Sequence, residues 1–304
     1  MTLRLWWVLP SIVASLGCAP GTEPAQQQEA SPPTVYVSNY PLKYFAERIT
    51  SPVVEVKLPV PADIDPAYWR PTAAEILALQ QADLILLNGA SYEAWLSNVS
   101  LPQSRLADTS GGLQQRLIPV DEKMTHSHGV EGEHAHTGTA FTTWMDLSLA
   151  VDQASAAKQV LVERWPEHRE QFEAQFESLA ADLIALDAKI GQTVASNPGL
   201  PVVFSHPVYQ YFESRYGVNG RSVHWEPGTM PDEAQREAFQ VLLQEFSPAW
   251  MIWEDEPDPQ AVAWLETKGV QSARVLPCAN QPQEGDFLEV WRQNLSELRQ
   301  IYQP

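Results

Sequence analysis

The stretch at residues 166–194, PEHREQFEAQFESLAADLIALDAKIGQTV, decides how the rest of the chain is interpreted. Its apolar residues recur at steps of three and four, which is the pattern of one apolar stripe along a helix. They are Phe172, Phe176, Leu179, Leu183, Leu186, Ile190 and Val194. At a rise of 1.5 Å per residue such a helix is about 45 Å long. We interpret it as a backbone helix that joins two lobes.

The segments on either side of this helix alternate between strand and helix patterns. Strands are expected at residues 34–38, 53–60, 83–88, 201–205, 249–254 and 273–276, and helices at 41–49, 71–82, 91–96, 209–216, 231–246, 259–268 and 286–302. This alternation predicts an α/β fold of two lobes, each with a mostly parallel sheet flanked by helices. It disfavours a helical bundle or coiled coil. Ligands of such folds bind at the carboxyl ends of the strands, which would face a cleft between the lobes.

Composition excludes several classes of function. The chain has 304 residues with 38 acidic against 19 basic residues, a net charge of -19, so it lacks the Lys and Arg clusters that bind nucleic acid. It contains no Gly-rich phosphate loop, no Gly-x-Ser-x-Gly motif, no His-Glu-x-x-His motif and no paired cysteines. We therefore predict a binding protein and not an enzyme.

The N-terminus has the features of an export signal. Within residues 1–18, a basic Arg4 precedes an apolar core and a small-residue end, and Cys18 directly follows that end. A signal followed by cysteine resembles a bacterial lipoprotein signal, which implies a lipid on Cys18 and an extracytoplasmic protein anchored to a membrane; plain secretion is the alternative. Residues 19–33 predict a flexible tether. The expected domains are a lobe at 34–164, a connecting helix at 165–197 and a second lobe at 198–304.

A histidine-rich loop is expected at residues 123–138. It contains His126, His128, His134 and His136, interleaved with Gly and Glu. Several imidazoles close together can wrap a borderline cation such as zinc. The alternative is a solvated polar loop without function.

Several motifs, in order along the whole mature chain, resemble the metal-binding solute receptors of bacterial ABC importers. They include Ser-Asn-Tyr-Pro-Leu at 38–42, Asn-Gly at 88–89, Trp-Met-Asp at 144–146, Ser-His at 205–206 and Glu-Pro at 226–227. The resemblance implies two α/β lobes with a long connecting helix, and zinc or manganese held in the cleft. It also implies delivery of the metal to a membrane permease.

The resemblance implies three histidines and an acidic residue as metal ligands, and only one position matches directly. Ala67 and Thr142 stand where the first two histidines belong, and Pro277-Cys278 stands where the acidic residue is expected. His206 matches. The usual site of the family is therefore altered in this chain.

Two hypotheses follow for the cleft. In the first, a rearranged set binds metal: His206 with Glu254, joined by Glu226 or His224, and with Cys278 as a further thiolate candidate. In the second, the aromatic residues of the region line a cleft for an organic cation or a chelated metal. These are Tyr68, Trp69, Trp144, Trp225 and Trp253. Each Trp is more typical of a core, and His224 of an ordinary loop histidine.

We predict a monomeric, membrane-tethered receptor that captures a divalent metal, zinc first and manganese second, for an ABC importer permease. A receptor for a chelated metal or small organic cation is the first alternative. A periplasmic metal buffer acting through the histidine-rich loop is the second.

Overall fold

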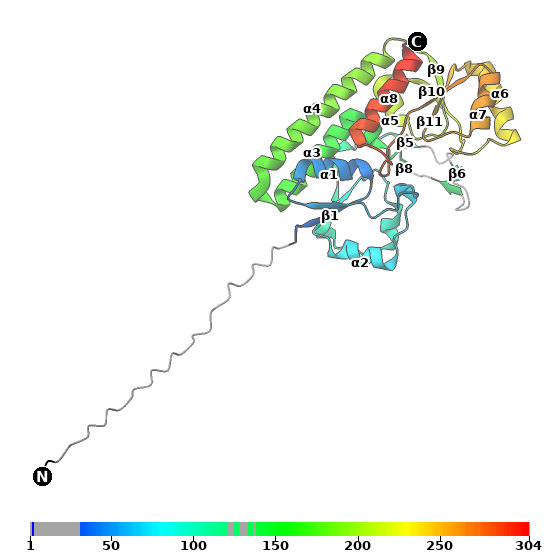
Figure 1. The fold of residues 1–304 in the computed structure, drawn as a ribbon. Helices are drawn as coiled ribbons and strands as arrows, with labels where there is room; N and C mark the ends of the chain where they lie inside the picture. The colour runs from blue at the N-terminus through cyan, green and yellow to red at the C-terminus, as the bar shows by residue number, and fades with distance from the viewer. Residues whose placement is uncertain (1, 3–30, 121–124, 128–132, 136–137, 304) are drawn as a thin grey trace. The chain divides into compact units, whose positions relative to one another are not determined.

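Two four-stranded parallel sheets form the framework, and both follow the same strand order (Figure 1). The computed structural model describes residues 2, 31–120, 125–127, 133–135 and 138–303, with no side chains described for 125–135. The first sheet has the order β2-β1-β3-β4 and the second the order β10-β9-β11-β12, with every neighbouring pair parallel. Their bounds are β1 (Thr34–Val37), β2 (Glu55–Lys57), β3 (Leu84–Leu87), β4 (Leu106–Asp108), β9 (Pro201–Phe204), β10 (Asn219–Ser222), β11 (Trp250–Trp253) and β12 (Gln271–Arg274). The predicted fold class is confirmed.

Helices connect the strands in both halves. They are α1 (Tyr40–Thr50) and α2 (Ala73–Gln81) in the first half, and α5 (Gln210–Tyr216), α6 (Glu233–Phe246), α7 (Pro259–Thr267) and α8 (Phe287–Tyr302) in the second. Short 3-10 turns add η1 (Pro66–Tyr68), η2 (Ala94–Asn98), η3 (Gln103–Arg105) and η4 (Gly111–Leu113). The sequence sets where they begin: the Asn39 side chain accepts from the Leu42 amide at the start of α1, and Thr72 with Glu75 forms a capping box on α2.

The predicted long helix is present as α4 (Arg169–Val194), preceded by the single turn η7 (Pro166–His168). Its apolar stripe is buried as expected, with Phe176 partly buried and the other six positions almost fully so. The stripe packs against α1, α8 and the helix α3 (Leu147–Arg164). Figure 1 shows α4 (green) beside α8 (red). Helix α4 therefore contacts elements from both halves of the chain.

Helix α3 is a long element that sequence patterning did not predict. Its buried face is made largely of small residues, Ala150, Ala154 and Ala157, with Leu161 near its end. Small side chains give a weak hydrophobic signal, yet they let two helix backbones approach closely. Asp146 caps the helix by accepting from the amides of Ser148 and Leu149.

Helix α8 contacts both halves of the chain. It follows the second sheet in sequence but packs on α1 of the first half, where the Phe287 ring lies 5.7 Å from Tyr44 and 5.4 Å from Phe45 between centroids. Residues 32–304 cluster as one unit. The terminal helix is thus shared between the two halves.

A hairpin stem leads into the histidine-rich segment. Strand β5 (Pro119–Val120) pairs antiparallel with β8 (Gly138–Thr139), and β6 (Thr125–Ser127) pairs with β7 (Glu133–Ala135) so that the backbones of His126 and His134 are opposite each other. His128 and His136 lie outside the described residues, as do the predicted signal, Cys18 and nearly all of the tether. Among the residues that the structure describes, no helix is long and apolar enough to cross a membrane.

Candidate metal centre

His206 lies just beyond the carboxyl end of the central strand β9 in the second sheet. Ser205, which precedes it, donates its amide to Ile252 O of the neighbouring strand β11 at 2.8 Å. This bond continues the sheet by one residue and directs the next side chain out of the strand end. His206 is 3% exposed. It therefore occupies the strand-end position at which open α/β folds bind ligands.

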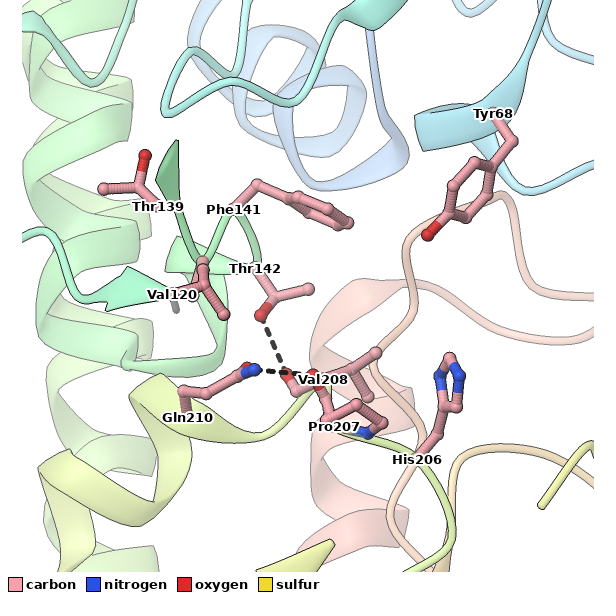
Figure 2. Close-up of a pocket in the computed structure, with 10 residues that line it drawn as sticks. Tyr68, Val120, Thr139, Phe141, Thr142, His206, Pro207, Val208 and Gln210 are labelled. Carbon is pink, nitrogen blue, oxygen red and sulfur yellow. Dashed lines mark hydrogen bonds between the residues drawn. The ribbon is translucent and has the colours of Figure 1, made fainter. Parts of the chain in front are cut away.

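His206 forms part of the wall of a pocket whose lining comes from both halves of the chain (Figure 2). The other lining residues are Tyr68, Val120, Thr139, Ala140, Phe141, Thr142, Pro207, Val208 and Gln210. The cavity volume is about 30 Å³. This is room for about two water molecules, far less than the several hundred Å³ of a typical organic-ligand site. In this conformation the pocket has the dimensions of an ion site.

Glu254 provides a carboxylate beside His206. It follows β11, and its Oε1 lies 3.4 Å from His206 Nδ1. The Glu254 amide donates to the Ser205 hydroxyl at 3.4 Å, so the two strand ends are linked beside the pocket. The Glu254 side chain is 18% exposed. The structure thus brings together the two residues that sequence analysis placed at the centre of a rearranged site.

His224 and Glu226 follow β10 on the same side of the second sheet. The His224 ring is perpendicular to the His206 ring, with 5.8 Å between centroids. The negative charges of Glu226 and Glu254 both act on the Tyr68 hydroxyl, so Glu226 is also close to the pocket. However, among the residues described, no three His, Cys, Asp or Glu side chains are arranged to hold a metal ion. The candidate ligands are neighbours but do not form a closed set in this conformation.

The two positions where the resemblance implies histidines carry side chains that cannot ligate. Ala67 is buried beside Tyr68 and has no donor atom. Thr142 lines the pocket, but its hydroxyl donates to Val208 O at 2.7 Å. The Gln210 side chain donates to Pro207 O at 2.6 Å (Figure 2). The Thr142 bond ties the turn that follows His206 to the wall from the first half, and the Gln210 bond closes the turn itself.

The structure does not bring Cys278, the further thiolate candidate, to the pocket. Cys278 packs against the main hydrophobic core and does not line the pocket. Burial, with a smaller contribution from Asp286, raises the pKa of the Cys278 thiol to about 12. In the metal-free protein the thiol is therefore protonated at neutral pH.

The four candidate tryptophans occupy the core, as is more typical of each, so they do not form the aromatic cleft of the second hypothesis. All four tryptophans are at most 4% exposed and lie in the hydrophobic cores: Trp69, Trp144, Trp225 and Trp253. Trp144 donates its ring nitrogen to Pro277 O at 2.8 Å, and Trp253 donates to the Ser272 hydroxyl at 3.2 Å. Of the aromatic residues that were candidates, only Tyr68 lines the pocket. The core is the commonest place for Trp, and it is the place found here.

Sequence reasoning missed most of the pocket wall. Phe141 and Val208 line it but carry no chemical signal that would distinguish them from core residues. Tyr68 was noticed only as an aromatic residue. Burial raises its pKa, and the nearby charges of Asp65, Glu254 and Glu226 raise it further. Its hydroxyl therefore lies among the carboxylates of the site.

Two parallel α/β sheets of one strand order, a long helix in contact with both halves and a pocket at a strand end are the features of a two-lobed solute-binding protein. The family described as "ZnuA: Zinc-uptake complex component A periplasmic" matches residues 35–301. The chain belongs to this family, whose members are solute-binding receptors and not enzymes.

Relatives with curated names share low sequence identity with the chain. The zinc-binding lipoprotein AdcA of Streptococcus pneumoniae is 21% identical over 287 residues, covering 90% of this chain and 57% of AdcA. The chain thus spans little more than half the length of AdcA. The high-affinity zinc uptake system protein ZnuA of Bacillus subtilis is 22% identical over 274 residues, covering 87% of this chain and 86% of that protein.

Solved structures show the same fold. The metal-dependent lipoprotein YcdH from Bacillus subtilis has a TM-score of 0.75 at 19% identity, covering 89% of this chain and 99% of that one. The Zn(II)-bound ZnuA-like domain of Streptococcus pneumoniae AdcA has a TM-score of 0.75 at 16% identity. The match covers 90% of this chain and 100% of that domain.

Proposed function

We propose that this protein is the receptor of a metal ABC importer, that it captures a divalent metal, and that zinc is preferred with manganese second. Its ligands would be His206 and Glu254, joined by His224 and Glu226 after a small rearrangement. The family match and the zinc-binding names of AdcA and ZnuA support this assignment. A permease at the membrane would receive the metal.

The observation that carries the proposal is the spacing of His206 and Glu254. Two ligand atoms each about 2.1 Å from a zinc ion, at the tetrahedral angle, lie about 3.4 Å apart. The observed separation of His206 Nδ1 and Glu254 Oε1 is 3.4 Å. This pair could therefore share one ion without moving, which supports a metal and not a chelate as the ligand of a cavity of this volume.

Two further ligands would have to come from the segment after β10. The His224 ring is already 5.8 Å from the His206 ring, and Glu226 acts on the same hydroxyl as Glu254. His224 is exposed, so its side chain has room to rotate. A site of two imidazoles and two carboxylates has the ligand types that zinc accepts and that manganese tolerates.

The test is a calorimetric titration of zinc and manganese into protein that starts at Ala19. The variants are His206→Ala, a deletion of residues 123–138, and His168→Ala as a control histidine outside the pocket. We expect one tight zinc site that is lost in His206→Ala and kept in the other two variants. Weak multiple binding that disappears only with the deletion would contradict the pocket site and favour a metal buffer at the histidine-rich loop.

We further propose that Cys18 carries a lipid that anchors the protein outside the cytoplasm, and that the protein acts as a monomer. The support is the sequence of residues 1–18 and the lipoprotein relatives. Mass spectrometry of protein from membranes tests the anchor: we expect acyl mass on Cys18 that is absent in Cys18→Ser. Unmodified Cys18 in soluble extract would contradict it.

A further inference from the structure

Local hydrogen bonds set the direction of the Tyr68 side chain. Tyr68 ends the 3-10 turn η1, and its amide donates to Asp65 O at 3.0 Å. The Asp65 carboxylate in turn accepts from the Ala67 amide at 2.9 Å and caps the turn. The conformation of this turn therefore follows from the sequence Asp-Pro-Ala-Tyr, with Pro66 suited to the first position.

The loop that leads to Tyr68 is tied to the second half of the chain. The side-chain amide of Asn280 donates to Pro61 O at 2.7 Å and to Ile64 O at 2.8 Å. Asn280 lies in the segment between β12 and α8. In the same segment, Ala279 O accepts a hydrogen bond from the Tyr40 amide at 2.9 Å. These contacts hold the loop, and with it Tyr68, against the half that carries His206.

Few polar side chains are directed into the pocket. Thr142 and Gln210 donate to the backbone of residues 207–208, and the Thr139 hydroxyl donates to Ala90 O at 3.3 Å. The Tyr68 hydroxyl and the His206 imidazole are the polar side-chain groups of the lining that face the interior. Figure 2 shows the two rings on facing sides of the pocket, with the Tyr68 hydroxyl directed inward.

Three carboxylates lie close enough to Tyr68 for their charges to act on it. Asp65, Glu254 and Glu226 act on its hydroxyl, and Glu254 is the partner of His206. A hydroxyl can donate one hydrogen bond, and a carboxylate is its strongest acceptor. Such a bond fixes which carboxylate oxygen points at an ion and which points away from it.

We infer that Tyr68 is a positioning residue that determines metal specificity: its hydroxyl, which is directed into the pocket beside His206, would donate to a carboxylate ligand of the ion such as Glu254. This inference rests on the proposed function. The hydroxyl comes from the first half of the chain, beside Ala67, and contributes there a polar group that Ala67 lacks. It orients a carboxylate, and carboxylate ligands matter more to manganese than to zinc, which accepts imidazole equally well.

The test compares Tyr68→Phe, which removes only the hydroxyl, with Tyr36→Phe, a half-buried tyrosine on β1 that does not line the pocket. Loss of an outer hydrogen bond to a metal ligand weakens binding by about 10- to 100-fold. We expect such a loss for manganese in Tyr68→Phe, a smaller loss for zinc, and no change in Tyr36→Phe. Cobalt(II) serves as a spectroscopic probe, and its visible absorption should change only in Tyr68→Phe.

The outcomes separate this inference from the proposed function. Equal metal affinities and identical cobalt spectra for Tyr68→Phe and the unaltered protein would overturn the role of Tyr68, provided that His206→Ala still abolishes binding. Equal weakening of zinc and manganese would overturn the specificity role. If the unaltered protein itself binds neither metal tightly, both the proposed function and this inference fail.

Discussion

Glu254 and Glu256 lie two residues apart after β11, and only Glu254 contacts the candidate site. Glu254 is 3.4 Å from His206, whereas Glu256 pairs with Arg274 on the surface. We expect Glu254→Gln to weaken zinc binding at least tenfold, about the effect of disturbing a metal ligand's environment. Glu256→Gln should bind zinc as the unaltered protein does. Calorimetry measures both, and equal affinities for the two variants would remove Glu254 from the ligand set.

Glu93 is a buried carboxyl group that lies apart from the candidate ligands. It accepts from the Asn88 amide at 2.6 Å and from the Gly89 amide at 3.2 Å, yet burial raises its pKa to about 7. A carboxyl group whose pKa is raised on folding keeps its proton in the folded state while the unfolded chain has lost it. The free energy of unfolding should therefore fall as pH rises from about 4.5 to 7, and level off above that.

Glu93→Gln should remove this part of the pH dependence of the free energy of unfolding. For a pKa raised from 4.5 to about 7, that part is about 3 kcal/mol at most. Glu213, whose pKa burial also raises to about 7, is unchanged in both proteins and cancels in the comparison. Urea unfolding of metal-free protein at both ends of the pH range measures the difference. The same loss of stability in both proteins would show that Glu93 ionises normally.

At the scale of elements, α4 gives a matched pair of neighbouring residues. Leu183 is fully buried, whereas Ile184 is 57% exposed. Truncation of a buried leucine to alanine costs about 2–5 kcal/mol because it leaves a cavity. Leu183→Ala should lower the free energy of unfolding by that amount, and Ile184→Ala by about 0.5 kcal/mol or less. Urea unfolding compares them, and similar losses would contradict the helix orientation described here.

The elements that could be predicted from sequence are those with a strong apolar pattern. Helix α4 has a stripe of large residues, and β3 is the uninterrupted run LILL, buried at all four positions. Helix α3 was missed because alanines form its buried face. Strand β10, of sequence NGRS, was missed because it is a polar edge strand whose place depends on its partner β9. There Gly220 lies against the Phe204 ring, where any side chain would collide.

Some residues of the candidate site could also be predicted from sequence, and others could not. The place of His206 could be predicted because the Ser-His motif resembles that of the family and because strand ends meet at the ligand side of a sheet. Its role as a metal ligand stays a prediction. The inward placement of Tyr68 depends on the capped turn at Asp65, and its contact with the second half depends on Asn280. Contacts between residues so far apart in sequence leave no local pattern.

At the scale of the whole molecule, the two halves should unfold together. Helix α8 packs on α1 through Phe287, and α4 contacts α1, α5 and α8. We expect Phe287→Ala to cost about 3–5 kcal/mol and to shift the unfolding of both halves equally. Tryptophan fluorescence and circular dichroism should give coincident transitions. Two separate transitions, with only one shifted by the substitution, would show that the halves are independent domains.

The packing of Phe287 on Phe45 also determines when folding can finish. The first half buries α1 against a helix that follows the second sheet in sequence, so its core cannot be completed until that helix has been synthesised. Contacts between the two ends of a chain form slowly because the intervening loop must close first. For a chain that is threaded unfolded through an export channel, as residues 1–18 predict, this delay is useful. A chain whose first core stays open until α8 has been made would remain unfolded for longer, which would suit such export.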